Sequence, residues 1–317
     1  MKALPTLAAL GLAPLVLANH AHAHGYAGDH MFISTLLIDD PNVADEASLP
    51  TFNFLPQPTG GGAAPNQYAL NFEFDKRITE NFGFALNDGY TWLTQPGAKT
   101  ANGWQSLVVT LKYKPYVNAE HEFLVSGGVA RTFARTGANG PNGALLGNDD
   151  SSSTTPTIYF AKGFGDLPIP LLRPFAITGQ LGYSIADRKL KVDPTDFTPV
   201  NNGIANAWEG GLSLQYSMRY LSSQVKDYGF PEFVNKLTPV VELSWTSPAS
   251  KPNDGFQTQY LWGVGVNYTT TGYAFGVEML VPGNRNTGSH IGVVAQFHLY
   301  FDDIFPRSLG APITKWF

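Results

Sequence analysis

Apolar residues at every second position, repeated along most of the chain, constrain its fold more than any other feature. Between residues 67 and 75 the even positions are aromatic or aliphatic, and the odd positions are polar or small. The same alternation recurs at residues 82–86, 107–113, 123–129, 175–183, 212–220, 241–245, 260–268, 273–279 and 293–301. Because successive side chains of a β-strand point to opposite faces, this period predicts strands with one apolar and one polar face.

The length of these segments separates two all-β architectures. Strands of soluble proteins are usually about five or six residues long, whereas a tilted strand that crosses a bilayer needs about 9–11. Residues 105–116 and 207–220 keep the alternation over that longer span. The pattern therefore favours an antiparallel transmembrane β-barrel, with lipid on the apolar face and the lumen on the polar face, over a soluble sandwich.

The composition agrees with a surface that meets lipid. Asp, Glu, Lys and Arg make up 14% of the residues, well below the roughly 25% of soluble domains. The chain has no cysteine, and its net charge of -5 makes nucleic acid an unexpected partner. Nothing in the sequence predicts a cofactor.

The first 23 residues have the features of an export signal peptide. A positive start at Met1-Lys2 precedes an apolar run over residues 4–17 and the cleavage pattern Ala21-His22-Ala23. The run is shorter than the roughly 20 residues of a membrane-spanning helix, and no later segment approaches that length without interruption. We expect an exported protein of the bacterial outer membrane whose mature form begins at His24.

The connections alternate between tight turns and long polar loops. Turns are expected at residues 79–81, 117–119 and 270–272, and loops at 95–103, 136–153, 189–202 and 248–255. With further strands at 50–55 and 157–163, about twelve strands leave both termini in the periplasm. The predicted organisation is a signal peptide (1–23), an N-terminal periplasmic or plug segment (24–49), the barrel (50–301) and a C-terminal periplasmic extension (302–317).

Aromatic residues sort to the two ends of these strands, as expected for the girdles of a membrane barrel. The external ends carry Trp92, Trp104, Trp208, Trp245 and Trp262, and the periplasmic ends carry Tyr116, Tyr220, Tyr268, Tyr273 and Tyr300.

Two stretches near the mature N-terminus resemble a known group of proteins. They are residues 33–51, which contain ISTLLIDDP, VADE and SLPT, and residues 74–83, FDKRITENFG. The chain resembles uncharacterised proteobacterial outer-membrane β-barrel proteins, which are loosely similar to the transporters attributed to the meta pathway of phenol degradation. The resemblance implies a barrel in the outer membrane and a small apolar or aromatic solute, and it carries no active-site motif.

Inward-facing charged and polar residues are the candidate functional residues. They are Glu73, Asp75, Lys112, Lys114, Glu122, Arg131, Glu209, Arg219, Glu242, Glu278 and His298. Both signs of charge are present. Two interpretations remain open: the residues line a conducting pore, or they pair across the lumen and stabilise a polar interior without conduction.

Three segments outside the strands invite hypotheses. Residues 30–50 begin apolar and turn acidic, so we expect them to enter the barrel and narrow it, with a periplasmic cap or a partner-binding arm as alternatives. The connection 222–237 is either an interfacial helix or docking surface, or a clamp on the barrel rim. In the last segment, either Phe301 or Phe317 is the residue that the outer-membrane assembly machinery recognises.

Other functional classes have weaker support. His24 and His30 are weak candidates for a metal site, because two ligands at loose spacing do not define one. A lipid hydrolase would need Ser213 or Ser217 beside His298, and the chain has no G-x-S-x-G motif. We therefore predict a pore or transporter for small solutes rather than an enzyme, with a structural or partner-binding barrel as the alternative.

Overall fold

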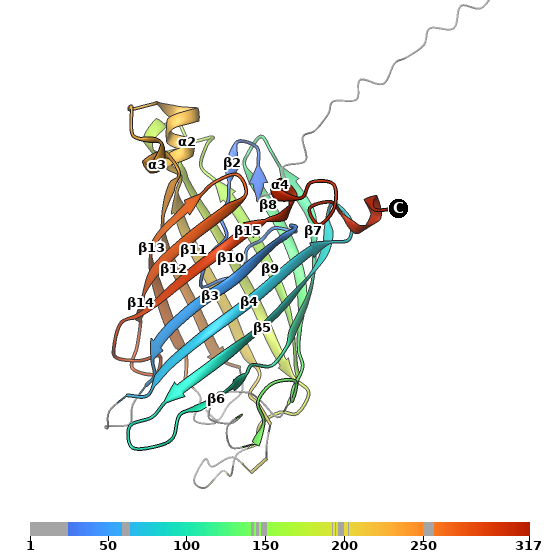
Figure 1. Ribbon diagram of the computed structural model, residues 1–317, viewed down its shortest axis with the longest axis vertical. Coiled ribbons are helices and arrows are strands. Elements are labelled where there is room, and N and C mark those ends of the chain that lie inside the picture. Colours follow the sequence, from blue (N-terminus) through green and yellow to red (C-terminus); the bar gives the residue numbers. More distant parts are fainter. Residues whose placement is uncertain are drawn as a thin grey trace, which may run out of the picture.

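The described chain forms a closed antiparallel barrel of 12 strands (Figure 1). The computed structural model describes residues 25–317 except 59–63, 141–142, 144–145, 147–150, 192, 194, 196–199, 202 and 250–256. The barrel strands are β3 (Glu46–Pro56), β4 (Asn66–Arg77), β5 (Phe82–Thr94), β7 (Val108–Asn118), β8 (Phe123–Thr132), β9 (Ser153–Gly163), β10 (Phe175–Ala186), β11 (Ala207–Tyr216), β12 (Leu237–Pro248), β13 (Gln259–Thr269), β14 (Tyr273–Pro282) and β15 (Gly292–Tyr300). The expected signal peptide, its cleavage site and His24 lie outside the described residues.

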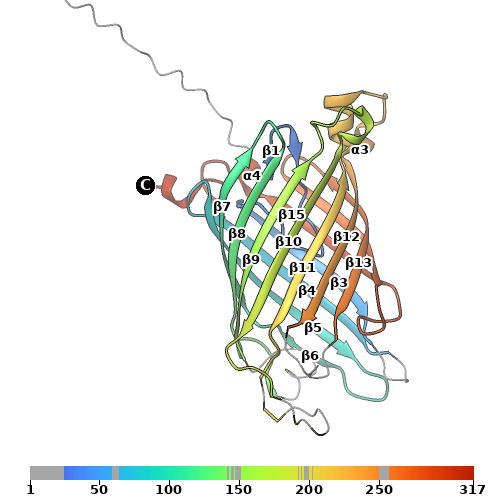
Figure 2. The same cartoon turned by 180° about the vertical axis from the view of Figure 1, so that it is seen from behind.

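Each strand pairs with its neighbours in sequence, and the first and last strands close the barrel. β15 pairs with β3 from Val293↔Phe54 to Tyr300↔Glu46, with a register shift between Gln296 and His298. The short turns, the C-terminus and the hairpin of β1 (Tyr26–Ala27) and β2 (His30–Met31) lie at one end, and the long loops lie at the other (Figures 1 and 2). This arrangement matches the predicted topology.

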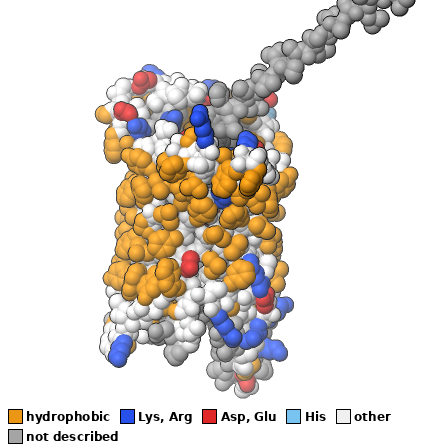
Figure 3. All heavy atoms as spheres, turned by 45° about the vertical axis from the view of Figure 1, so that its right-hand side comes forward, with side chains coloured by type: hydrophobic (Ala, Val, Ile, Leu, Met, Phe, Trp, Pro, Cys, Tyr) orange, Lys and Arg blue, Asp and Glu red, His pale blue; other side chains and the backbone are white. Residues whose placement is uncertain are grey.

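The alternation of exposed and buried side chains confirms the two faces expected from the sequence. Ile158 and Phe275 are 66% and 48% exposed on the outer face, whereas Glu242 and Glu278 are 0% and 1% exposed inside. Apolar side chains form a band across the middle of the outer surface, and most charges lie beyond it (Figure 3). A closed barrel with this belt is the outer-membrane architecture, because only closure leaves no unpaired strand edge in lipid.

Several element boundaries differ from the sequence-based expectation. β3 begins at Glu46 rather than residue 50, and β6 (Ala101–Trp104) pairs with β5 and shortens the predicted loop 95–103. β11 ends at Tyr216 because the Ser217 side chain accepts a hydrogen bond from the Tyr220 N–H and caps helix α2 (Met218–Tyr220).

That helix corrects two predictions. Arg219 is exposed on α2, beyond the end of the strand, so its predicted place in the lumen is wrong. Tyr220 is buried rather than at the lipid interface, so its place in the periplasmic girdle is also wrong.

Short helices lie at the end of the barrel that carries the β1–β2 hairpin and the C-terminus (Figure 1). The connection 217–236 contains α2, the π-helix η2 (Leu221–Val225) and α3 (Glu232–Asn235). η1 (Pro170–Leu172) lies in the connection before β10, and α4 (Phe301–Ile304) and η3 (Ile313–Lys315) lie in the C-terminal extension. Among the described residues, no helix is long and apolar enough to span a membrane.

Candidate functional site

Residues 32–45 run inside the barrel without forming a helix or strand, and inward side chains of the wall bind their backbone. The Ile33 N–H donates to Gln215 Oε1 of β11 at 3.2 Å, and Asn267 Nδ2 of β13 donates to the Ser34 carbonyl at 3.1 Å. Such bonds replace the backbone partners that an irregular buried segment would otherwise lack. We call residues 32–45 the lumen segment.

A buried carboxylate holds the middle of the lumen segment. The N–H groups of Leu36 and Leu37 donate to the two oxygens of Glu242, on β12, at 3.3 and 2.6 Å. Glu278 approaches from β14 across Gly263, where an added Cβ would lie 2.0 Å from Glu278 Oε2. A side chain at this position would have to displace the second carboxylate.

Two lysines of β7 bind the acidic half of the lumen segment. Lys112 Nζ lies 2.8 Å from Asp39 Oδ1 and donates to the Asp40 carbonyl at 2.9 Å. Lys114 Nζ donates to Asn42 Oδ1 at 2.8 Å. On the next strand, the Ser126 hydroxyl of β8 donates to the carbonyl of Pro41. The wall therefore contacts the segment on opposite sides of the lumen.

The N-terminal side of the lumen segment is fixed at the β1–β2 hairpin. His30 is fully buried, and its Nδ1 lies 3.5 Å from Glu122 Oε2. Glu122 also accepts hydrogen bonds from the Tyr220 hydroxyl at 2.9 Å and the Gly165 N–H at 2.8 Å. Burial alone would raise the pKa of Glu122, but His30 and these two donors outweigh burial and hold it below its ordinary value.

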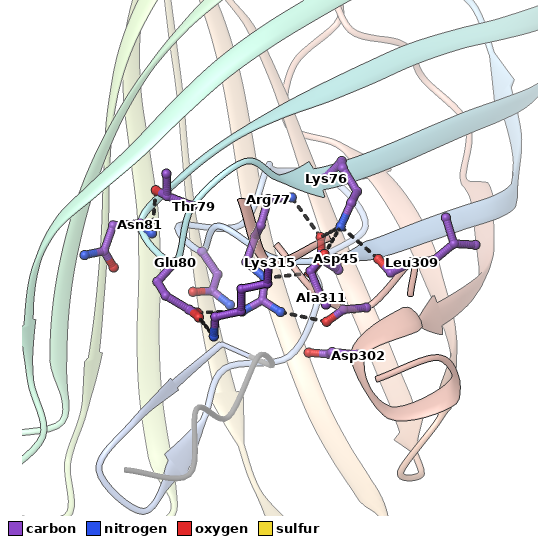
Figure 4. Close-up of polar contacts among 12 residues, drawn as sticks. Asp45, Lys76, Arg77, Thr79, Glu80, Asn81, Asp302, Leu309, Ala311 and Lys315 are labelled. Carbon is purple, nitrogen blue, oxygen red and sulfur yellow. Dashed lines mark hydrogen bonds and ion pairs between the residues drawn. The ribbon is translucent and has the colours of Figure 1, made fainter. Parts of the chain in front are cut away.

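The C-terminal side is fixed by a buried ion cluster around Asp45 (Figure 4). The fully buried Asp45 carboxylate accepts from Lys76 Nζ at 2.6 Å and from Arg77 Nε at 2.7 Å. Lys76 also donates to the carbonyls of Leu309 and Ala311 at 2.9 and 2.7 Å. The cluster therefore joins the lumen segment, the end of β4 and the C-terminal extension.

Sequence analysis missed this cluster. Its only sequence feature is the pair of adjacent cations that ends β4, and the partner Asp45 is 31 residues away.

The other predicted lumen residues occupy different environments. Glu73, Asp75 and Glu209 are partly buried on inward positions of β4 and β11. Glu122 lies in the turn 119–122 rather than on a strand. Arg131 is the penultimate residue of β8, on the long-loop side, where it forms an ion pair with the exposed Asp187.

The residues considered for hydrolysis have other partners. His298 Nδ1 lies 2.9 Å from Ser48 Oγ and its Nε2 lies 3.1 Å from Glu46 Oε2, so the ring links β15 to β3. Ser217 caps α2, and no contact among the described residues joins Ser213 or Ser217 to His298. The described residues also contain no group of three or more His, Cys, Asp or Glu side chains that could hold a metal ion.

A cavity of about 480 Å³ remains in the lumen beside the lumen segment. Residues 35–39 form part of its wall, and it reaches Thr132 and Ser153, which are strand ends on the long-loop side. Other lining side chains are mainly hydroxyl and amide groups: Thr51, Asn71, Asn87, Gln105, Thr110, Thr155, Gln180 and Gln296.

Comparison with known proteins supports the fold. No family profile and no curated protein matches the sequence. The structure is similar to the COG4313 outer membrane channel from Pseudomonas putida F1, with a TM-score of 0.52 and 12% identity over 80% of this chain and 93% of that one. The NanC porin is similar with a TM-score of 0.47 and 9% identity over 79% of this chain and 98% of that one. The KdgM porin in complex with disordered oligogalacturonate is similar with a TM-score of 0.43 and 10% identity over 80% of this chain and 98% of that one. At 12% identity the likeness to the COG4313 channel shows a shared barrel fold alone.

Proposed function

We propose that the protein is an outer-membrane channel for small solutes and that the lumen segment is its plug. The observation that carries this proposal is the set of hydrogen bonds from β7, β8, β11, β12 and β13 to residues 33–42. They hold an irregular segment across the interior of a barrel that is complete without it.

The plug is held by hydrogen bonds to wall side chains, and water can replace such bonds. A single hydrogen bond contributes about 0.5–1.5 kcal/mol net, and a bond to a charged group about 1.5–3. The backbone groups of the barrel strands bond to one another, and the strands bind residues 33–42 through side chains. Displacement of the plug would therefore leave the barrel wall intact.

An engineered disulfide tests the proposal, because the chain has no cysteine of its own. A Cβ added at Gly211 of β11 would lie 3.2 Å from Ile38 Cβ, close to the 3.5–4.5 Å of disulfides. In planar bilayers we expect the oxidised Ile38→Cys/Gly211→Cys variant to conduct least. Reduction should restore the conductance of the single variants, and Glu242→Ala, which removes the acceptor of Leu36 and Leu37, should raise it.

The alternative function is a structural or partner-binding barrel without conductance, and the anchors at both ends of the lumen segment favour it. Equal unitary conductance in the oxidised, reduced and Glu242→Ala proteins would contradict the plug. Absence of conductance in every variant would favour the alternative. The single cysteine variants under oxidising conditions are the matched controls.

A further inference from the structure

The side chains that line the lumen cavity are mainly polar, and some of them are fixed by hydrogen bonds to one another. Gln105 Nε2 donates to Asn71 Oδ1 at 2.8 Å and to Thr91 Oγ1 at 3.0 Å, so part of the polar wall is held in place by its own hydrogen bonds. The cavity of about 480 Å³ falls within the range of about 300–1,000 Å³ for small-molecule sites. Hydroxyls and amides on both sides of this space can donate to and accept from one solute.

The charges that line the cavity are of one sign. Asp39, Glu73, Asp88 and Glu209 contribute to the wall, and no Lys, Arg or His side chain lines it among the residues that the structure describes. Lys112 of β7 is 5% exposed and is bound to Asp39 of the plug. An anionic solute would meet carboxyl groups and no lining cation on the described wall, whereas an amine would gain partners.

We propose that this cavity binds small polyhydroxylated solutes that are neutral or carry an amine, and that it disfavours their carboxylated analogues. The role of this site in uptake rests on the proposed channel function, but binding itself requires no conduction. The sequence resemblance implies an apolar or aromatic solute instead. Such a ring would leave wall amides that face the cavity without hydrogen-bond partners.

Three sugars with one skeleton separate these possibilities: glucose, glucosamine and glucuronate. Saturation-transfer NMR on the full mature chain in detergent detects weak binding without a conducting pore. At about pH 6, where the amine is protonated, we expect glucose and glucosamine to bind and glucuronate to bind about tenfold more weakly than glucosamine. Equal or tighter binding of glucuronate would overturn the proposal, as would binding of none of the three.

Variants locate the binding to the cavity. Gln180→Trp places an indole in the cavity, and it should abolish binding of glucose and glucosamine. Glu209→Gln should lower the preference for glucosamine over glucuronate, whereas Glu232→Gln, which removes an equal charge from the exposed helix α3, should leave it unchanged. Binding that survives Gln180→Trp contradicts the site. The conductance of the disulfide variant is independent of these measurements, so each proposal can fail without the other.

Discussion

The Asp45 carboxylate binds two buried cations. Lys76 and Arg77 are 3% and 5% exposed, and both bind Asp45. Breaking a buried ion pair by removing one partner costs about 3–5 kcal/mol, because the remaining charge stays buried. We expect Asp45→Asn to lower the free energy of unfolding by this amount, measured by urea titration of the detergent-solubilised protein through tryptophan fluorescence.

The same cluster provides a control. Glu80 binds Arg77 at 3.2 Å and also binds Lys315, but 43% of its side chain is exposed. Exposed ion pairs contribute about 0–1 kcal/mol, so Glu80→Gln should have a small effect. Equal destabilisation by the two substitutions would show that burial does not determine the strength of the cluster.

Glu122 gives the attachment of the β1–β2 hairpin a dependence on pH. Its pKa is lowered, so its stabilising contribution is complete above the ordinary carboxyl value of about 4.3 and is lost as the pH falls through the lower folded value. The difference in unfolding free energy between the wild type and Glu122→Gln should therefore shrink as the pH falls below about 4. Glu120→Gln, an exposed change in the same turn, should show no such trend in the same titration. A difference that is constant across this range would contradict the assignment.

At the scale of elements, the indole of Trp316 links distant residues of the C-terminal extension. Trp316 Nε1 donates to the carbonyls of Ser308 and Ala311 at 2.9 and 3.0 Å, and the ring lies over Lys76. Trp316→Ala should loosen residues 305–316 and speed tryptic cleavage after Arg307 severalfold in a limited-proteolysis time course. Phe317 is fully exposed, and Phe317→Ala is the matched control. Unchanged cleavage of the Trp316 variant would show that contacts other than those of the indole, such as the Asp45 cluster, hold the extension.

The strands could be predicted from the sequence because the residues of each strand alternate between an apolar and a polar face. The end of β11 could not, since Met218 and Tyr220 continue the alternation although Ser217 has already capped a helix. Inward positions such as Glu242 followed from parity, but parity does not indicate that Glu242 binds the N–H groups of Leu36 and Leu37, 206 and 205 residues away. The Asp45 cluster was missed for the same reason. The alternation of apolar and polar residues indicates which face of a strand a residue occupies. Its long-range partners depend on how the closed barrel brings distant segments together.

At the scale of the whole molecule, the barrel is stable only if its outer face meets lipid along the full belt. Ile158 lies at the centre of β9 and is 66% exposed. A lysine on the lipid face near the bilayer midplane costs about 2–4 kcal/mol, and an inward lysine does not meet lipid. We expect Ile158→Lys to lower the fraction of protein that folds into phospholipid vesicles, measured by heat-modifiable migration across a urea series. Thr155→Lys, whose side chain would enter the lumen cavity from the same strand, should fold like the wild type. If both variants fold equally well, or if the mature protein stays folded and monodisperse in buffer without detergent, the outer face does not contact the acyl chains and the channel proposal loses its basis.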